Sequence, residues 1–165
     1  MDKKKILTNS QIKRKIKRIS LQIIESNIEE KEVVLVGIEQ NGFLLAKELN
    51  KMITEFSNLN IKLCSLKIDK KNPLNNISTS LNSSEYKNKS IVVVDDVLNS
   101  GSTLMYAVKH FLDTELRQLK TAVLVDRNHK KFPIKADFKG VSLSTSIQNH
   151  VKVQFDKNSI EAFLL

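Results

Sequence analysis

The sequence is poor in cysteine and in aromatic residues, and it has no long apolar run. Its only cysteine, Cys64, cannot form an internal disulfide and is typical of a protein in the reducing cytoplasm. No apolar stretch approaches the roughly 18 residues of a membrane span, and residues 1–11 lack the apolar core of a secretory signal. No spacing of cysteine and histidine suggests a zinc site. We therefore expect a cytoplasmic protein without membrane attachment.

What the chain does have is enough apolar content for one core, together with a large positive charge. Its 165 residues, 41% of them hydrophobic, suffice for one domain and argue against global disorder. The formal net charge of +9 favours partners that carry phosphate, such as nucleotides, sugar phosphates or nucleic acid. A composition rich in lysine and asparagine is also typical of AT-rich genomes, so charge alone identifies no partner.

Apolar runs and helical periodicities alternate along the chain. Apolar segments predict strands at residues 32–38, 61–68, 90–96, 121–127 and 150–155. Isoleucine spacing after the capping-box pair Thr8 and Gln11 predicts a first helix, and helices are expected over 8–27, 42–56 and 102–116. Irregular structure is expected over 69–89 and 128–146. This alternation predicts one α/β domain over residues 1–165, with a mostly parallel sheet flanked by helices.

The segment IVVVDDVLNSGST, residues 91–103, has the clearest chemical signal in the chain. Four apolar residues lead into Asp95 and Asp96, and a turn of small polar residues precedes a helix that starts near Ser102. Ligands of open parallel sheets bind at the carboxyl ends of the strands, and helix N-termini bind phosphate through free N–H groups. The turn therefore predicts a phosphate site, and the two carboxylates predict a site for ribose hydroxyls or for Mg²⁺.

Three other interpretations of this segment fit less well. A P-loop requires a lysine before its serine or threonine, and that lysine is missing. A response-regulator receiver has its paired acids after its first strand, and too little chain follows Asp96 for that fold. A simple helix cap explains the serines but not two acids after a buried strand.

The segment VVVDDVLNSGST resembles the signature with which type I phosphoribosyltransferases bind phosphoribosyl pyrophosphate. Three further segments are similar, in order and spacing, to the pyrimidine-operon attenuation regulators of that family: ILTNSQIKRKIKRIS, LVGIEQNGFLLAKEL and AVLVDRNHKKFPIKADFKG. The resemblance covers nearly the whole chain, apart from a shortened and altered 69–89 region. It implies a type I phosphoribosyltransferase fold with a small hood, Mg²⁺ as cofactor, assembly as dimers or larger homo-oligomers, and formation of UMP from uracil.

The resemblance also implies roles for individual residues. Asp95 and Asp96 correspond to the catalytic and metal-binding acids that hold the ribose hydroxyls. The residues implied to bind the 5-phosphate are Asn99, Ser100, Gly101, Ser102 and Thr103. Those implied to meet the pyrophosphate are Glu39, Gln40, Asn41 and Gly42, and those implied to border the base are Val125, Asp126, Arg127 and Phe138. Residues 69–89 correspond to a flexible lid loop, and residues 127–150 to a base-binding hood region.

The chain departs from the family pattern where positive charge is expected. Relatives commonly have Lys-Thr-Arg-Gly where this chain has Glu39-Gln40-Asn41-Gly42, and often an arginine where it has Ser102. The run KIDKKNPLNN replaces a Tyr-Arg-Asp-Asp type of lid sequence. Each lost charge-assisted hydrogen bond to phosphate lowers the binding free energy by about 1.5–3 kcal/mol. Weakened pyrophosphate handling is therefore expected, unless Lys70 and Lys71 of the lid compensate.

A basic N-terminal region suggests a second role. Arg14 and Arg18 share one face of the first expected helix, with Lys17 beside them. The resemblance implies that these residues and His129 contact RNA, in an mRNA leader. A solvated helix face is the alternative, because Leu21 stands where RNA-binding relatives have histidine and only 5% of residues are aromatic.

Three functional hypotheses follow from the sequence. The first is a uracil phosphoribosyltransferase that uses phosphoribosyl pyrophosphate and also regulates pyrimidine genes by binding RNA. The second is a nucleotide-sensing, RNA-binding regulator with little catalysis, and the third is a purine-type phosphoribosyltransferase on the same scaffold. A panel of bases in one transfer assay separates all three.

Overall fold

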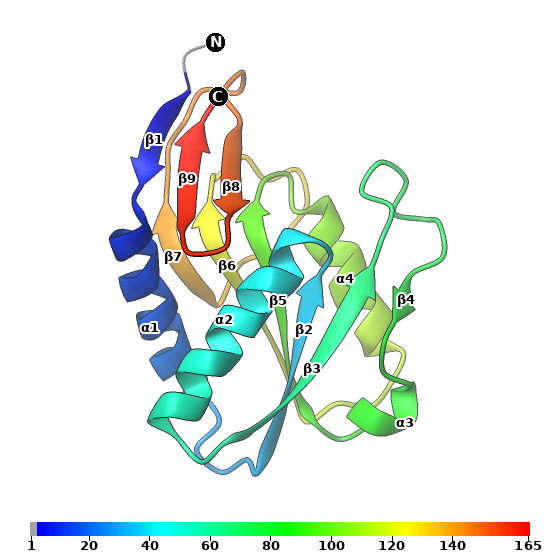
Figure 1. Cartoon of the computed structure of the whole chain (residues 1–165). Helices are drawn as coiled ribbons and strands as arrows, with labels where there is room; N and C mark the ends of the chain where they lie inside the picture. Colours follow the sequence, from blue (N-terminus) through cyan, green and yellow to red (C-terminus); the bar gives the residue numbers. More distant parts are fainter. Residues whose placement is uncertain (1–2) are drawn as a thin grey trace.

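A six-stranded sheet forms the centre of the molecule in the computed structural model, which describes residues 3–165 (Figure 1). The strand order is β4-β3-β2-β5-β6-β7, and all neighbours are parallel except β3 and β4. The strands are β2 (Glu32–Ile38), β3 (Asn60–Lys67), β4 (Ser78–Thr79), β5 (Ser90–Leu98), β6 (Gln118–Asp126) and β7 (Phe138–Ser142). The predicted α/β fold with a mostly parallel sheet is confirmed.

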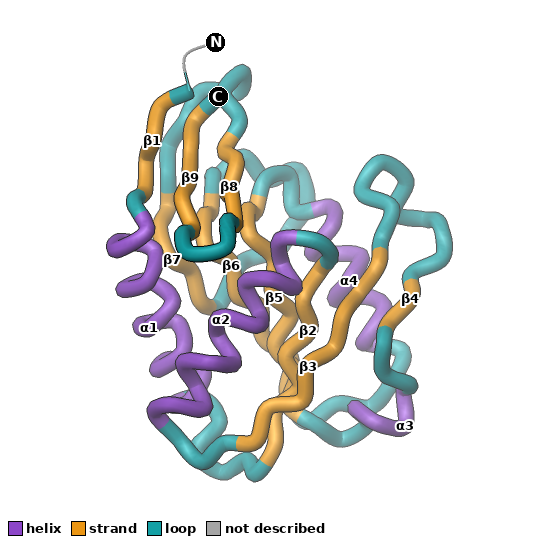
Figure 2. Tube along the Cα trace, in the orientation of Figure 1, coloured by secondary structure: helices purple, strands orange, loops and turns teal. Residues whose placement is uncertain are grey.

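Helices cover both faces of this sheet (Figure 2). Helices α1 (Asn9–Glu25) and α2 (Asn41–Phe56) pack together on one face, in one continuous apolar cluster with alternate residues of β2, β5 and β6. Helix α4 (Ser102–Leu112) and the short α3 (Ser83–Tyr86) pack on the other face, against the remaining strand residues. Strands buried on both faces are apolar throughout, which explains the continuous apolar runs of the sequence.

Helix α1 begins as the sequence predicts. The Thr8 hydroxyl accepts a hydrogen bond from the Gln11 backbone N–H, and the Gln11 side chain accepts one from the Thr8 N–H at 2.8 Å. This capping box satisfies two of the N–H groups that a helix start leaves unpaired. The isoleucines predicted to face the core are all buried, at positions Ile12, Ile16, Ile19 and Ile23.

The order of the strands determines where a ligand can bind. Strands β2 and β5 are neighbours, but the chain continues from β2 to β3 on one side and from β5 to β6 on the other. Such a reversal opens a crevice at the carboxyl ends of the two central strands. The segment 39–42 after β2 and the segment 95–103 at the end of β5 both lie at this edge, so the fold brings together two motifs that are far apart in sequence.

A small second sheet lies beyond the carboxyl ends of the main strands (Figure 1). It consists of β1 (Lys4–Leu7), β9 (Ile160–Leu164) and β8 (Val151–Phe155), in the order β1-β9-β8, with antiparallel pairing throughout. The chain's two ends therefore pair with each other beside the ligand-binding edge. Of these three strands the sequence predicted only β8.

Two segments that were expected to be irregular contain regular structure. The 69–89 segment includes β4, which pairs with β3, and α3, which is capped by Asn82. The longest irregular stretch here, 68–77, is the loop of the β3–β4 hairpin and projects beyond the carboxyl end of β3 (Figure 2). The 128–146 segment includes β7, which extends the main sheet. None of the described helices has the length and apolarity needed to span a membrane.

Candidate active site

The two acids of the central motif lie on β5 itself, which continues to Leu98. Asp95 is buried, whereas Asp96 is half-buried. Successive side chains of a strand point to opposite faces of a sheet, and the contacts of the acids agree with this. Asp95 faces the start of α4, and Asp96 accepts a hydrogen bond from Asn41 at the start of α2. The two acids nevertheless interact, since Asp96 contributes to the raised pKa of Asp95, and Asp95 Oδ1 also lies beside Gly42 at the start of α2.

Burial determines the protonation of Asp95. Loss of solvent raises its pKa to about 8, and the neighbouring Asp96 carboxylate acts in the same direction. The ammonium of Lys70, 3.7 Å from Asp95 Oδ1, opposes the shift. A proton on Asp95 therefore persists into the neutral range, and a bound cation or hydroxyl donor at this position would favour the ionised carboxylate.

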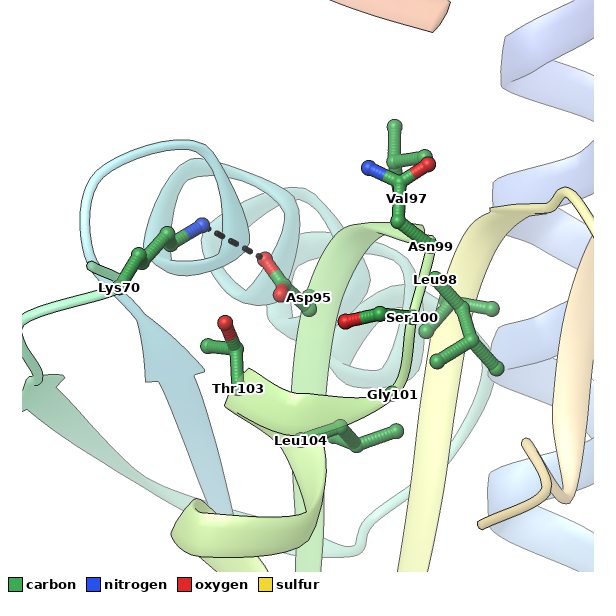
Figure 3. Close-up of a pocket in the computed structure, with 10 residues that line it drawn as sticks. Lys70, Asp95, Val97, Leu98, Asn99, Ser100, Gly101, Thr103 and Leu104 are labelled. Atoms are coloured by element: carbon green, nitrogen blue, oxygen red, sulfur yellow. Dashed lines mark ion pairs between the residues drawn. The ribbon is translucent and has the colours of Figure 1, made fainter. Parts of the chain in front are cut away.

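The turn between β5 and α4 is the candidate phosphate cradle predicted from the sequence. Gly101 precedes the helix with a φ of 85°, in the left-handed region that glycine adopts most easily. The N-cap Gly101 offers no side-chain cap, and the Ser102 N–H donates only a long bond to Ser100 Oγ at 3.3 Å, so the following N–H groups at the helix start remain available to a ligand. A small cavity of about 90 Å³ lies here, and Figure 3 shows Asp95, Ser100 and Thr103 directed toward the same space.

The structure brings most of the predicted 5-phosphate residues to this cavity. It is lined by Lys70, Asp95, Val97, Leu98, Asn99, Ser100, Gly101, Thr103, Leu104 and Val123. Ser102 does not line it, although its backbone N–H lies in the same turn and donates to Ser100 Oγ at 3.3 Å. Lys70 was not among the residues assigned to this site, although it was named with Lys71 as a lid lysine that could compensate for the missing cations.

The turn 39–42 follows β2 and leads into α2. The peptide bond between Glu39 and Gln40 is cis. Gly42 packs directly on β5, since a Cβ at this position would lie 2.6 Å from the Val94 carbonyl oxygen and 3.2 Å from Asp95 Oδ1. The absence of a side chain at Gly42 therefore lets this turn approach the acids closely.

Both amide protons of the Asn41 side chain are engaged within the protein. Its Nδ2 donates to Asp96 Oδ2 at 2.8 Å and to the Val153 carbonyl of β8 at 3.0 Å. An amide nitrogen has two protons to donate, and both are used. Asn41 therefore links the turn, the second acid and the small sheet, and residues 39–42 present no cationic side chain to a ligand.

The structure separates the four residues predicted to border the base. Val125 and Asp126 are completely buried at the end of β6. Phe138 lies at the opposite end of β7, paired with Ala122, and packs in the core beside α1 and α2. The four side chains therefore do not form one surface at the carboxyl edge.

Arg127 is buried and connects three segments. Its guanidinium donates to Asn99 Oδ1 at 2.8 Å, to Thr145 Oγ1 at 3.2 Å and to the Ser146 carbonyl at 3.2 Å, and it also contacts the Asn149 carbonyl. Asp126 accepts from the Asn128 N–H and lies 3.6 Å from the ammonium of Lys130. Arg127 thus holds Asn99, at the edge of the phosphate cradle, against the loop before β8.

The residues predicted to contact RNA lie on two elements. Arg14, Lys17 and Arg18 are exposed on α1, but Arg18 Nη2 also donates to the Gly140 carbonyl of β7 at 2.6 Å. The Lys17 ammonium lies 4.8 Å from the centre of the Phe56 ring. His129 is in the loop after β6, where its Nε2 contacts the Thr145 carbonyl and must therefore carry the proton.

Comparison with known proteins identifies relatives in sequence and in structure. The phosphoribosyl transferase domain model matches residues 2–158. The chain is 35% identical over 160 residues to the bifunctional protein PyrR of Clostridium perfringens, covering 92% of this chain and 90% of that protein. It is 33% identical to the bifunctional protein PyrR of Pediococcus pentosaceus, with 91% and 90% coverage.

Solved structures with the same fold are more distant in sequence. A hypoxanthine-guanine phosphoribosyltransferase of Bacillus anthracis superposes with a TM-score of 0.77 at 18% identity, over 98% of this chain and 99% of that one. The hypoxanthine phosphoribosyltransferase of Trypanosoma cruzi gives a TM-score of 0.77 at 17% identity, over 96% and 95%. These similarities establish the fold and do not identify a substrate.

Proposed function

The chain belongs to the phosphoribosyl transferase domain family, and from this premise we propose that it transfers the phosphoribosyl group of phosphoribosyl pyrophosphate to uracil. In that reaction a ring nitrogen of the base forms a bond to C1 of the ribose, and the bond from C1 to the pyrophosphate oxygen breaks. UMP and pyrophosphate are the products. One observation carries the proposal: an acid and an uncapped helix start line the same cavity at the crevice between β2 and β5.

Each part of this edge suits one part of the substrate. The free N–H groups at the start of α4, with the hydroxyls of Ser100 and Thr103, suit the 5-phosphate. The carboxylates of Asp95 and Asp96 are acceptors for the two ribose hydroxyls. The turn 39–42 lies beside both acids, with Asn41 bonded to Asp96 and Gly42 packed next to Asp95, and is our candidate for the pyrophosphate end. Positioning and charge neutralisation are what such a transfer requires of the protein.

The donor set fits Mg²⁺ bound jointly with substrate. Mg²⁺ commonly takes one or two carboxylates and completes its shell with phosphate oxygens and water. The described residues 3–165 contain no group of three or more potential protein ligands that could hold a metal ion. Asp95 and Asp96 would therefore contribute at most part of the shell, and Mg²⁺ would neutralise charge on the departing pyrophosphate.

Uracil is the base that the comparisons favour. The PyrR proteins are 33–35% identical to this chain, whereas the purine enzymes of the same fold are 17–18% identical. Labelled uracil, hypoxanthine and guanine, each incubated with phosphoribosyl pyrophosphate and Mg²⁺, give a direct test. We expect labelled UMP from uracil only, and product from a purine alone would reject the assignment.

We also propose that the exposed face of α1 binds the mRNA leader of pyrimidine genes. Arg14, Lys17 and Arg18 lie together on that face, and the net charge of +9 favours contact with phosphate. Such contacts fix position on the RNA backbone, while bases are read in unpaired loops. Filter binding at rising salt is the test, and an affinity that is insensitive to salt would contradict this role.

A second candidate is a nucleotide sensor with little turnover. It is favoured by the turn 39–42, whose Glu39, Gln40 and Asn41 provide no cation for pyrophosphate. Tight binding of UMP together with no product from any base would select this candidate over the enzyme.

A further inference from the structure

The loop between β3 and β4 adds a cation to the candidate site. Lys70 lines the same cavity as Ser100, Gly101 and Thr103, and its Nζ lies 3.7 Å from Asp95 Oδ1. Figure 3 shows the ammonium directed from the loop toward Asp95, across the opening from Thr103. Lys70 is the only lysine or arginine that lines this cavity in the described part of the chain.

The loop has an internal structure that holds Lys70 in place. Asp69 Oδ1 accepts the backbone N–H groups of Lys71 and Asn72, at 2.9 and 3.2 Å, and Asp69 Oδ2 accepts the Asn75 side chain at 3.0 Å. The Asn72 and Asn75 side chains are also joined, at 3.1 Å. The β3–β4 pairing closes the hairpin below the loop. The run DKKNPLNN therefore folds into a compact turn, and Lys71, one residue further on, does not line the cavity.

The charges around the crevice are unevenly distributed. On the 39–42 side, the Asn41 amide protons are committed to Asp96 and to Val153, and Glu39 adds a negative charge. The Lys70 ammonium is half-exposed and lies 3.7 Å from Asp95 Oδ1, the same oxygen that a Cβ at Gly42 would approach to 3.2 Å, so it is a cation next to the turn 39–42. A diphosphate would be a strong partner for this cation, because an ammonium binds phosphate oxygens through charge-assisted hydrogen bonds.

We propose that Lys70 is the pyrophosphate-binding cation of this protein and determines its preference for phosphoribosyl pyrophosphate over a nucleoside 5-monophosphate. The inference rests on the proposed function, since it takes the cradle and the acids as the ribose 5-phosphate site. In the absence of ligand, Lys70 pairs with Asp95. When a ribose with a diphosphate on C1 binds, the ammonium pairs with the diphosphate and Asp95 is left to accept the ribose hydroxyls.

A simpler role for Lys70 is to neutralise Asp95 without touching the ligand. The two roles differ in their effect on two ligands that share the ribose 5-phosphate. Phosphoribosyl pyrophosphate has a diphosphate on C1, and UMP has a base there. If Lys70 acted only through Asp95, its loss would weaken the binding of both ligands equally. If Lys70 contacts the diphosphate, its loss would weaken the binding of phosphoribosyl pyrophosphate alone.

Calorimetric titration of the full chain with each ligand, in Mg²⁺ and without the other substrate, separates the two roles. For Lys70→Gln we expect about tenfold or greater loss of affinity for phosphoribosyl pyrophosphate and less than about threefold for UMP. Lys70→Arg keeps the charge and should stay within about threefold of the wild type for both ligands. Lys71→Gln is the matched control, with the same change of net charge one residue away, and should shift neither affinity by more than about twofold.

The outcomes are distinguishable from failure of the proposed function. Equal losses for both ligands in Lys70→Gln, or losses no larger than those of Lys71→Gln, would overturn the role of Lys70 alone. A loss in Lys70→Arg as large as in Lys70→Gln would show that charge is not the determinant and would also overturn it. A wild-type chain that binds neither ligand would overturn the proposed function and this inference together. Circular dichroism on each variant verifies folding, which the exposed position of both lysines favours.

Discussion

The guanidinium of Arg127 donates a hydrogen bond to Asn99 Oδ1 at 2.8 Å and so joins the end of β6 to the candidate phosphate-binding turn. The same group holds Thr145, Ser146 and Asn149 in the loop before β8. Only 4% of the Arg127 surface is exposed, so these acceptors replace the water that would otherwise solvate its guanidinium. The shape of the cradle therefore depends on a residue that is too deeply buried to be a ligand-contacting cation.

Replacement of Arg127 by methionine should destabilise the protein. The substitution keeps an apolar stem of similar length but removes the guanidinium that donates to partly buried oxygens of Asn99, Thr145, Ser146 and Asn149. We expect the free energy of unfolding in urea to fall by about 2–4 kcal/mol. Arg14→Met, at an exposed position of α1, is the control and should change it by less than about 0.5 kcal/mol. Equal effects of the two substitutions would show that the Arg127 contacts contribute nothing to stability.

Gly42→Ala should also be destabilising, although helix propensity alone predicts the opposite. Alanine is favoured over glycine within a helix by about 1 kcal/mol. At Gly42, however, the new Cβ would lie 2.6 Å from the Val94 carbonyl oxygen, which is backbone and cannot move aside. We expect a net loss of about 1–3 kcal/mol in urea unfolding, together with reduced transfer activity, because α2 and Asp95 must shift apart. Glu55→Ala near the end of α2 provides the reference, and a stabilised Gly42→Ala protein would contradict the close packing.

The protein should lose stability as pH rises from about 4 to about 8, and Asp95 should be the cause. Its pKa is raised to about 8 in the folded state, from an ordinary value of 3.8, mainly by burial. Between these values the folded protein retains a proton that the unfolded chain has released. The free energy of unfolding therefore falls with pH in this window, by up to about 1.4 kcal/mol per unit, and the contribution is constant above pH 8.

Asp95→Asn isolates this contribution, because asparagine has the same shape and does not ionise. Urea unfolding of both proteins at pH 5, 6, 7 and 8 should show a steeper decline for the wild type than for the variant. The difference between the two curves removes the effect of all other titrating groups, apart from their coupling to Asp95. Parallel curves would mean that Asp95 is ionised throughout this range.

The sequence predicted those parts of the fold that local pattern determines. The isoleucine spacing of α1 and the apolar runs of β2, β5 and β6 correspond to elements of the structure because burial of one face or of both imposes those patterns. Strand β7 was missed because Lys139 and Gly140 interrupt its five residues. Strands β1 and β9 are short, and their pairing joins residues from the two ends of the chain.

In the candidate site, too, local sequence patterns were predictable and contacts between distant residues were not. The arrangement of 95–103 could be predicted because one continuous segment contains both the acids and the candidate phosphate turn. The contacts of Asn41 with Asp96 and Val153 join residues 55 and 112 positions apart, and no local pattern encodes them. Phe138 was assigned to the base by resemblance, yet its position at the amino end of β7 places it in the core. Lys70 reaches the cavity only because the β3–β4 hairpin folds back along the sheet.

The two arginines of α1 should differ in their contribution to the stability of the fold, although both should contribute to RNA binding. Arg14 is exposed and makes no side-chain hydrogen bond or ion pair to any other residue of the described range 3–165. Arg18 donates to the Gly140 carbonyl at 2.6 Å and so also holds α1 against β7. Arg14→Ala should therefore leave the free energy of unfolding unchanged, whereas Arg18→Ala should lower it by about 1 kcal/mol.

On a pyrimidine-operon mRNA leader, each substitution should weaken binding and reduce the slope of log affinity against log salt by about 0.7–1, the value for one lost phosphate contact. Lys87→Ala is the matched control, because Lys87 is an exposed cation beside α3 on the opposite face of the sheet from α1. It changes the net charge by the same amount and should leave the salt slope unchanged. If all three variants lost affinity equally, the RNA would be responding to net charge alone, and the face of α1 would not be its binding site.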